Sequence, residues 1–249
     1  MDSRRFKEIC EKIISTEREQ NGIGTLGEKT LHAVLKEYFE PDKAKHEKRV
    51  GSFVADIVTD NGIIEIQTGA FEKLRKKLAA FLEIYTVTVV YPIPKIKWLL
   101  WIDTQTGKMT KKRKSPKQGR IYDAIFELYK IRPFMNHINF RLCIVFVDLE
   151  EHRYLDGWNE NKKKGSTLCD RVPVDISEEI YFNNKADYAK FIPVELKCRF
   201  TSKDYKSAAN ISLYTAQTAL NIFNHIGAVK RIGKQGNLYI YGRYEKKKI

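Results

Sequence analysis

The sequence predicts an α/β fold followed by a smaller unit of helices and a β-hairpin. Apolar residues recur at helical spacing before residue 40 and again after residue 70. Between them, valine-rich alternating segments flank Asp60-Asn61-Gly62, a strong hairpin signal. Near the C-terminus, short helical segments precede a glycine-containing hairpin. The order helix, paired strands, helix, strand indicates a compact α/β unit that ends near residue 92.

The composition is that of a globular protein with a real core. The chain has 249 residues, of which 43% are hydrophobic and 12% aromatic, enough for one large domain or two ordinary ones. We expect no membrane span and no signal peptide, because the apolar runs are short and the N-terminus is charged. Four scattered cysteines lack metal or disulfide spacing, so we expect reduced thiols and a cytoplasmic protein.

The N-terminal elements follow from apolar spacing and from turn residues. Residues 2–19 form a first helix, and a second starts at Thr25 and ends before Pro41. Residues 44–59 and 63–68 alternate and are expected to be strands. The later expected elements are a helix over 71–85, strands at 87–90, 96–103 and 141–149, a helix over 121–129, and C-terminal helices at 185–192, 201–209 and from 212 to about 226, followed by a hairpin over 228–241.

The expected domain organisation has two units and a linker. Residues 156–175 are polar and lack periodicity, so we place the linker there, between domains at 1–155 and 176–249.

The charge of the chain favours a polyanionic partner. Its 45 basic and 31 acidic residues leave a net charge of +14. Residues 108–120 carry seven basic residues and no acidic one, and residues 195–249 have a net charge of +8. Phosphate contacts by such residues release condensed counterions. Composition alone leaves DNA, RNA, an anionic membrane surface and a merely solvated basic surface as alternatives.

The hairpin gathers polar residues on one face. If Asn61-Gly62 forms a two-residue type I′ turn, Val58 lies opposite Glu65 and Asp56 lies opposite Gln67. Opposed and alternate residues share a face, so Asp56, Glu65 and Gln67 converge. The other face would meet the core with Ile57, Ile64 and Ile66.

Two adjacent carboxylates without a protein cation repel one another and need compensation. A hard divalent cation, Mg²⁺ or Mn²⁺, suits oxygen ligands and would lower the pKa of a bound water. The alternative is a solvent-facing polar hairpin, although acidic residues are uncommon in strands. Of the histidines, His32 is expected to be packed on its helix, and His46 to face away from the acidic residues.

Residues 25–91 resemble the PD-(D/E)XK nuclease superfamily, which has the restriction-endonuclease-like fold. The resemblance rests on a helix with Glu28, then Asp56, a hairpin, and Glu65-Ile66-Gln67 before a helix. It implies a mixed sheet flanked by helices, with metal bound by Asp56, Glu65 and the Ile66 main-chain carbonyl. Gln67 stands where the superfamily normally has a lysine that activates the attacking water.

Other positions carry over from the same resemblance. Glu28 would reach the metal through water, although Thr25 and Glu28 also form a capping box. Positive residues of the next helix would contact the DNA backbone: Lys73, Arg75 and Lys76.

The C-terminal unit resembles a winged helix, whose recognition helix would follow Ser212 and enter the major groove. Side chains early on that helix would read bases: Tyr214, Thr215, Gln217 and Thr218. Basic residues of the hairpin would hold phosphates: Lys230, Arg231, Lys234 and Arg243. The alternative is a small helical module for protein contacts.

Together these features predict a magnesium-dependent endonuclease of double-stranded DNA, most simply a site-specific enzyme of the restriction type. A structure-selective nuclease, a transposition-type nuclease and a DNA-binding regulator with an inactive nuclease fold are the alternatives. A homodimer would allow both strands to be cut, although no feature of the sequence marks an interface.

Overall fold

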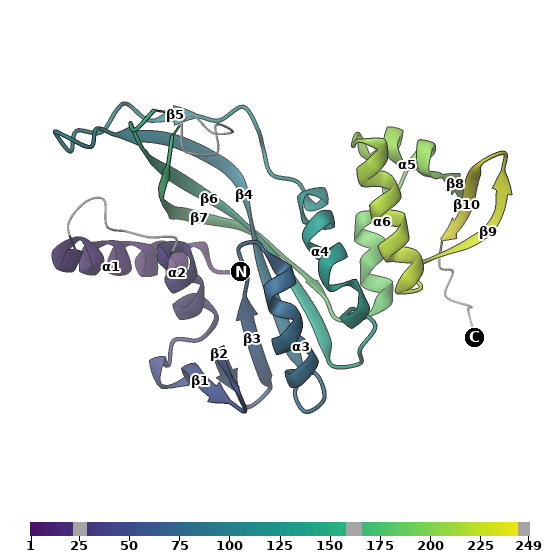
Figure 1. The fold of residues 1–249 in the computed structure, drawn as a ribbon, viewed down its shortest axis with the longest axis horizontal. Helices are drawn as coiled ribbons and strands as arrows, with labels where there is room; N and C mark the ends of the chain where they lie inside the picture. The colour runs from purple at the N-terminus through teal and green to yellow at the C-terminus, as the bar shows by residue number, and fades with distance from the viewer. Residues whose placement is uncertain (22–28, 158–165, 244–249) are drawn as a thin grey trace.

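The structure, a computed structural model, describes residues 1–21, 29–157 and 166–243. Its main body is a seven-stranded mixed sheet with helices on both faces (Figure 1). The predicted α/β class, with a mixed sheet flanked by helices, is therefore confirmed.

The elements of this body alternate as expected along the chain. Its helices are α1 (Ser3–Asn21), α2 (Lys29–Phe39), α3 (Arg75–Phe81) and α4 (Ile125–Ile131). Its 3₁₀ turns are η1 (Lys43–Lys45), η2 (Phe71–Leu74), η3 (Ile121–Ala124) and η4 (Arg132–Phe134). Its strands are β1 (His46–Val50), β2 (Phe53–Thr59), β3 (Gly62–Ile66), β4 (Val87–Ile102), β5 (Arg113–Lys114), β6 (Phe140–Tyr154) and β7 (Leu168–Phe182).

The strands pair in the order β1-β2-β3-β4-β6-β7, and β5 pairs with β4 at its far end. β3, β4 and β6 are parallel neighbours, whereas the pairs toward both edges are antiparallel. Parallel neighbours need crossover connections. α3 provides one between β3 and β4, and α4 provides the other between β4 and β6 (Figure 1).

Two hydrophobic clusters occupy the two faces of the sheet. Val90 packs with α1 and α2 on one face, and its neighbour Val89 packs with α3 and α4 on the other. This explains why three of the four residues at 87–90 are valine, because a strand covered on both faces has no side that faces water.

Three segments differ from expectation. Residues 44–59 are two strands, separated by a turn at Gly51, whose φ of +58° favours glycine. β4 continues through Pro92 and Pro94 as one strand with a register shift after Pro94, where proline has no N–H to donate. Residues 168–175, expected in the linker, instead form the first half of β7, since Cys169 and Val172 are buried against β6.

The register of the β2–β3 hairpin also differs from expectation. Thr59 lies opposite Gly62, so the turn residues are Asp60 and Asn61, and neither has the positive φ of a type I′ turn. Gly62 enters the strand instead, because a Cβ there would lie 2.2 Å from the Thr86 carbonyl oxygen. The shift of two residues places Asp56 opposite Glu65, and Gln67 beyond the paired region.

The C-terminal unit contains η5 (Lys185–Phe191), β8 (Arg199–Thr201), α5 (Ser202–Ala209), α6 (Leu213–His225), β9 (Val229–Gln235) and β10 (Leu238–Arg243). Thr201 and Ser212 cap α5 and α6 as expected. β10 pairs with both β9 and β8. α6 lies beside α4, and Phe223 joins the cluster that also holds α3 (Figure 1). In the part of the chain that the structure describes, no helix is both long and apolar enough to cross a bilayer.

Candidate functional site

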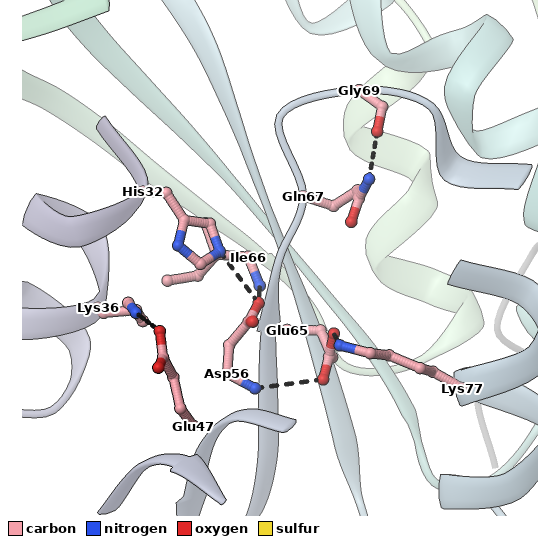
Figure 2. Close-up of polar contacts among 9 residues, drawn as sticks. All are labelled: His32, Lys36, Glu47, Asp56, Glu65, Ile66, Gln67, Gly69 and Lys77. Carbon is pink, nitrogen blue, oxygen red and sulfur yellow. Dashed lines mark hydrogen bonds and ion pairs between the residues drawn. The ribbon is translucent and has the colours of Figure 1, made fainter. Parts of the chain in front are cut away.

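Asp56 and Glu65 meet where β2 and β3 separate (Figure 2). The main-chain N–H of Ile66 donates to Asp56 Oδ2 at 2.8 Å, and that of Asp56 donates weakly to Glu65 Oε1 at 3.4 Å. The carboxylate of Asp56 thus takes a main-chain donor of β3. These bonds tie the two acidic residues together across the end of the hairpin.

Each carboxylate has a basic partner from a different helix layer. His32 Nε2, from α2, lies 3.2 Å from Asp56 Oδ2. Lys77 Nζ, from α3, lies 2.8 Å from Glu65 Oε2. Figure 2 shows α2 and α3 approaching from opposite sides. The expectation of a carboxylate pair without a protein cation is therefore wrong, because Lys77 pairs with Glu65. His32, which we expected to be packed rather than catalytic, lies within hydrogen-bond distance of Asp56.

The environment moves the two carboxyl pKa values apart. Burial and the nearby charge of Asp56 raise the pKa of Glu65 to about 7, and the hydrogen bond from Lys77 offsets only part of this rise. Burial also opposes ionisation of Asp56, but the hydrogen bond and charge of His32 and the Ile66 N–H bring the pKa of Asp56 below its ordinary value. Asp56 is thus the anion of the pair, and Glu65 gains or loses its proton near neutral pH.

Gln67 does not join the two carboxylates. Its side-chain amide donates to the Gly69 carbonyl, in the turn that follows β3 (Figure 2). That turn includes Ala70 in the left-handed region, with φ of +55°, and leads into η2. The expected convergence of three polar residues therefore holds for Asp56 and Glu65 alone, because the register places Gln67 past the last paired residue.

β1 brings a further acidic residue to the edge of the site. Glu47 has a φ of +50° and interrupts the pairing of β1 opposite Asp56. Its carboxylate accepts a hydrogen bond from Lys36 Nζ at 2.6 Å (Figure 2). A left-handed non-glycine residue stores strain of the kind found at functional sites. His46, one residue earlier, faces away as expected and bonds the Glu40 carbonyl.

The donors at this site have the chemistry of a hard-cation site. The described residues contain no group of three or more histidine, cysteine, aspartate or glutamate side chains placed to hold a metal. The set implied by the sequence has two carboxylates, Asp56 and Glu65, and one main-chain carbonyl, that of Ile66. All three are oxygen donors, which suit Mg²⁺ or Mn²⁺. Glu28 lies outside the described residues.

The start of α6 presents only some of the expected base-reading side chains. Tyr214 and Gln217 are exposed. The Thr215 hydroxyl pairs with Ser212 Oγ at 2.8 Å. Thr218 is buried and its hydroxyl donates to the Tyr214 carbonyl, so we correct its expected role as a reader of bases.

The basic residues divide in the same way. Lys230, Arg231 and Lys234 are exposed on β9, and the last two lie over the Tyr239 ring. Arg243 instead donates to the carbonyls of Pro193, Val194 and Leu196, so its expected phosphate contact is replaced by a structural one.

The basic residues expected to contact DNA from the next helix lie on its outer surface. Lys73 and Lys76 are exposed. Arg75 is held by the Lys130 carbonyl at 2.7 Å and lies over the Phe134 ring.

Lys77 lies at the candidate site although the sequence analysis did not predict it there, and its spacing carried a signal. Leu74, Leu78 and Phe81 are buried at helical spacing, and position 77 completes the i, i+3, i+4, i+7 pattern. A lysine within an inward stripe requires an acidic partner. The partner, Glu65, is separated by 12 positions and depends on how α3 packs.

Comparison with known proteins places this site inside a family. Residues 29–183 match the family described as Domain of unknown function (DUF8091). The chain belongs to this family. The match runs from α2 to β7, so it includes Asp56, Glu65 and Lys77 and ends before α5 and α6. An uncharacterized protein of Treponema pallidum (strain Nichols) is 28% identical over 169 residues, which are 68% of this chain and 67% of that protein. No solved structure matches the chain.

Proposed function

We propose that this protein is a metal-dependent DNA endonuclease of the PD-(D/E)XK type. The observation that carries the proposal is the meeting of Asp56 and Glu65 on neighbouring strands, with Lys77 beside Glu65. The order α2, β1, β2, β3, α3, β4 also agrees with the helix, hairpin, helix and strand of the resemblance. The restriction-endonuclease-like fold is part of this proposal.

In this proposal each group at the site has a separate role in binding the metal or positioning the water. Asp56, Glu65 and the Ile66 carbonyl would hold Mg²⁺ or Mn²⁺, which supplies charge neutralisation at the phosphate and a more acidic water. Ile66 N–H and His32 orient the Asp56 carboxylate. Lys77 supplies the positive charge that Gln67 lacks and would orient the attacking water. Gln67 would then shape the turn above the site.

DNA would be engaged by the C-terminal unit. α5, α6 and the β9–β10 hairpin, with β8 beside β10, follow the order of a winged helix, and this supports a site-specific enzyme of the restriction type. In this proposal Tyr214 and Gln217 approach the bases, and Lys230, Arg231 and Lys234 approach phosphates. A homodimer would allow both DNA strands to be cut.

The test is plasmid cleavage by the full chain with Mg²⁺, with EDTA, and with Glu65→Ala and Asp56→Ala. Discrete fragments from the wild type with Mg²⁺ alone support the proposal. Glu83→Gln, which changes an exposed side chain beyond α3, is the matched control and should cleave normally. Equal cleavage by wild type and Asp56→Ala would overturn the assignment of the site.

A second candidate is a DNA-binding regulator with an inactive nuclease fold. The observation that favours it is that His32 and Lys77 already partner the two carboxylates, so a metal is not the only possible compensation. Isothermal titration with Mg²⁺ separates the candidates. Binding that is lost in Glu65→Ala supports the nuclease, whereas salt-sensitive DNA binding with no Mg²⁺ binding supports the regulator.

A further inference from the structure

Exposed aromatic side chains gather where α4 meets α6. Phe126 and Tyr129 on α4 are 41% and 46% exposed, and Tyr214 on α6 is 69% exposed. The rings of Phe126 and Tyr214 stack with centroids 5.3 Å apart and planes 25° apart. Phe126 therefore supports one face of Tyr214, and the high exposure of Tyr214 leaves ring surface open to solvent. Clustered exposed rings of this kind mark interaction surfaces.

A hollow of about 710 Å³ adjoins this ring pair. Its walls are the segment 117–123, the start of α6, and β4 near Tyr91. The volume falls within the roughly 300–1,000 Å³ typical of ligand sites. Arg120 holds the two walls together, because its guanidinium donates to the Asn210 carbonyl at 2.9 Å and also to the Ala209 carbonyl.

The wall of the hollow contacts residues that follow the turn after β3, the strand that carries Glu65. Tyr91 in its wall packs against Phe71 with ring centroids 5.0 Å apart. Phe71 directly follows the turn that begins at Gln67, and its N–H donates to Glu127 on α4. Packed side chains therefore connect the wall of the hollow to the turn that follows β3.

The charge of the wall selects the kind of partner. Two of the basic residues of segment 108–120, Lys117 and Arg120, line the hollow, together with the acidic Asp123. Lys117 lies at the mouth, 76% exposed, and is paired loosely with Asp123 at 3.3 Å. Flat apolar rings beside an exposed lysine suit a polyanion with flat faces, which is nucleic acid.

We propose that Tyr214, supported by Phe126, stacks on an unpaired base of DNA, and that Lys117 at the mouth of the hollow contacts the adjoining backbone. The reason is geometric. A paired, stacked base offers only its edge in a groove, whereas a ring face needs a base that has left the stack. This inference rests on the proposed function for the identity of the polymer, and it adds that the enzyme engages its DNA through a base that has left the stack.

The test is fluorescence anisotropy of labelled DNA with the full chain in EDTA, so that no cleavage occurs. Two duplexes of equal length are compared, one fully paired and one with a three-nucleotide gap. Tyr214→Ala should weaken binding to the gapped duplex by at least about tenfold and to the paired duplex by less than about twofold. Tyr214→Phe keeps the ring and should bind as the wild type does. Tyr181→Ala removes an exposed tyrosine (41%) on β7, away from the hollow, and is the control that should not discriminate between the two duplexes.

A second readout is independent of folding losses. 5-Iododeoxyuridine at the gap should photocrosslink to Tyr214 of the wild type, as identified by mass spectrometry. If Tyr214→Ala weakened binding to both duplexes equally, or to neither, the stacking inference would be overturned. If binding to the gapped duplex depends on the Tyr214 ring but no DNA is cleaved in Mg²⁺, the proposed nuclease activity is overturned and the stacking inference stands. If DNA is cleaved but binding does not depend on the ring, the stacking inference is overturned and the nuclease proposal stands.

Discussion

Replacing Glu65 with glutamine tests the electrostatics of the site without removing its shape. The Glu65 side chain is only 2% exposed, and its pKa is raised to about 7 by burial and by Asp56. The folded state therefore holds a proton between pH 4.5 and about 7 that the unfolded chain has released. Stability conferred by this group is complete below pH 4.5 and is lost as the pH rises through about 7.

The expected magnitude follows from the pKa. At about 1.4 kcal/mol per pH unit, a rise from 4.5 to about 7 corresponds to about 3 kcal/mol, of which about 2 to 3 kcal/mol is lost between pH 5 and pH 8. Glu65→Gln has no proton to lose. Its free energy of unfolding, relative to wild type, should therefore rise by about 2 to 3 kcal/mol from pH 5 to pH 8.

Urea unfolding at both pH values measures this difference. Titrating groups common to both proteins largely cancel, and Asp56 stays ionised throughout because its pKa is lowered. Mg²⁺ should stabilise the wild type at pH 8 and leave Glu65→Gln unchanged, since a ligand that binds only the folded state raises its stability. A variant-to-wild-type difference that is the same at pH 5 and pH 8 would refute the reasoning.

Three further predictions concern neighbouring parts of the structure. Lys77→Gln should strengthen Mg²⁺ binding severalfold at pH 8 and lower cleavage at least about tenfold, as checked by calorimetry and plasmid cleavage; a parallel loss of both would reduce Lys77 to a structural role. Gly62→Ala should destabilise the fold by several kcal/mol in urea, because its Cβ would clash with the Thr86 carbonyl oxygen at 2.2 Å, and unchanged stability would disprove the hairpin register. Arg243→Ala should cost about 1–3 kcal/mol of stability, whereas Lys230→Ala should preserve stability and lower the salt dependence of DNA binding by about one ion; the opposite pattern would reassign both residues.

Periodicity predicted the elements that bury a stripe or a full face. Local patterns predicted α6 with its Ser212 cap, the valine-rich strand at 87–90 and the helices before residue 40. Local patterns failed where a distant contact decides. The turn at Asp60-Asn61 is set by the approach of the Thr86 carbonyl to Gly62, which no rule about hairpin residues contains. The polar appearance of residues 168–175 likewise concealed an edge strand that buries Val172.

The acidic pair was predictable, and its partners were not. A register shift of two residues keeps side chains on their faces, so Glu65 stayed beside Asp56 despite the wrong turn. His32 and Lys77 arrive from helices 24 and 12 positions away, and their approach depends on how α2 and α3 pack on the sheet. Because His32 and Lys77 already partner the two carboxylates, a metal is not needed to compensate them and would instead compete with these two side chains.

That competition suggests how such a site could work. Lys77 is 26% exposed at the end of a flexible side chain, so its ammonium can leave Glu65 without opening the core. A divalent cation carries twice the charge and takes oxygens that the ammonium would release. The ammonium of Lys77, released by metal binding, would remain within reach of a water near Glu65 and would donate a hydrogen bond to it. The same pairing therefore protects a buried carboxylate before metal arrives and supplies a water-positioning group afterwards. On this view the pairing of Glu65 with Lys77 belongs to the metal-free state of an active enzyme.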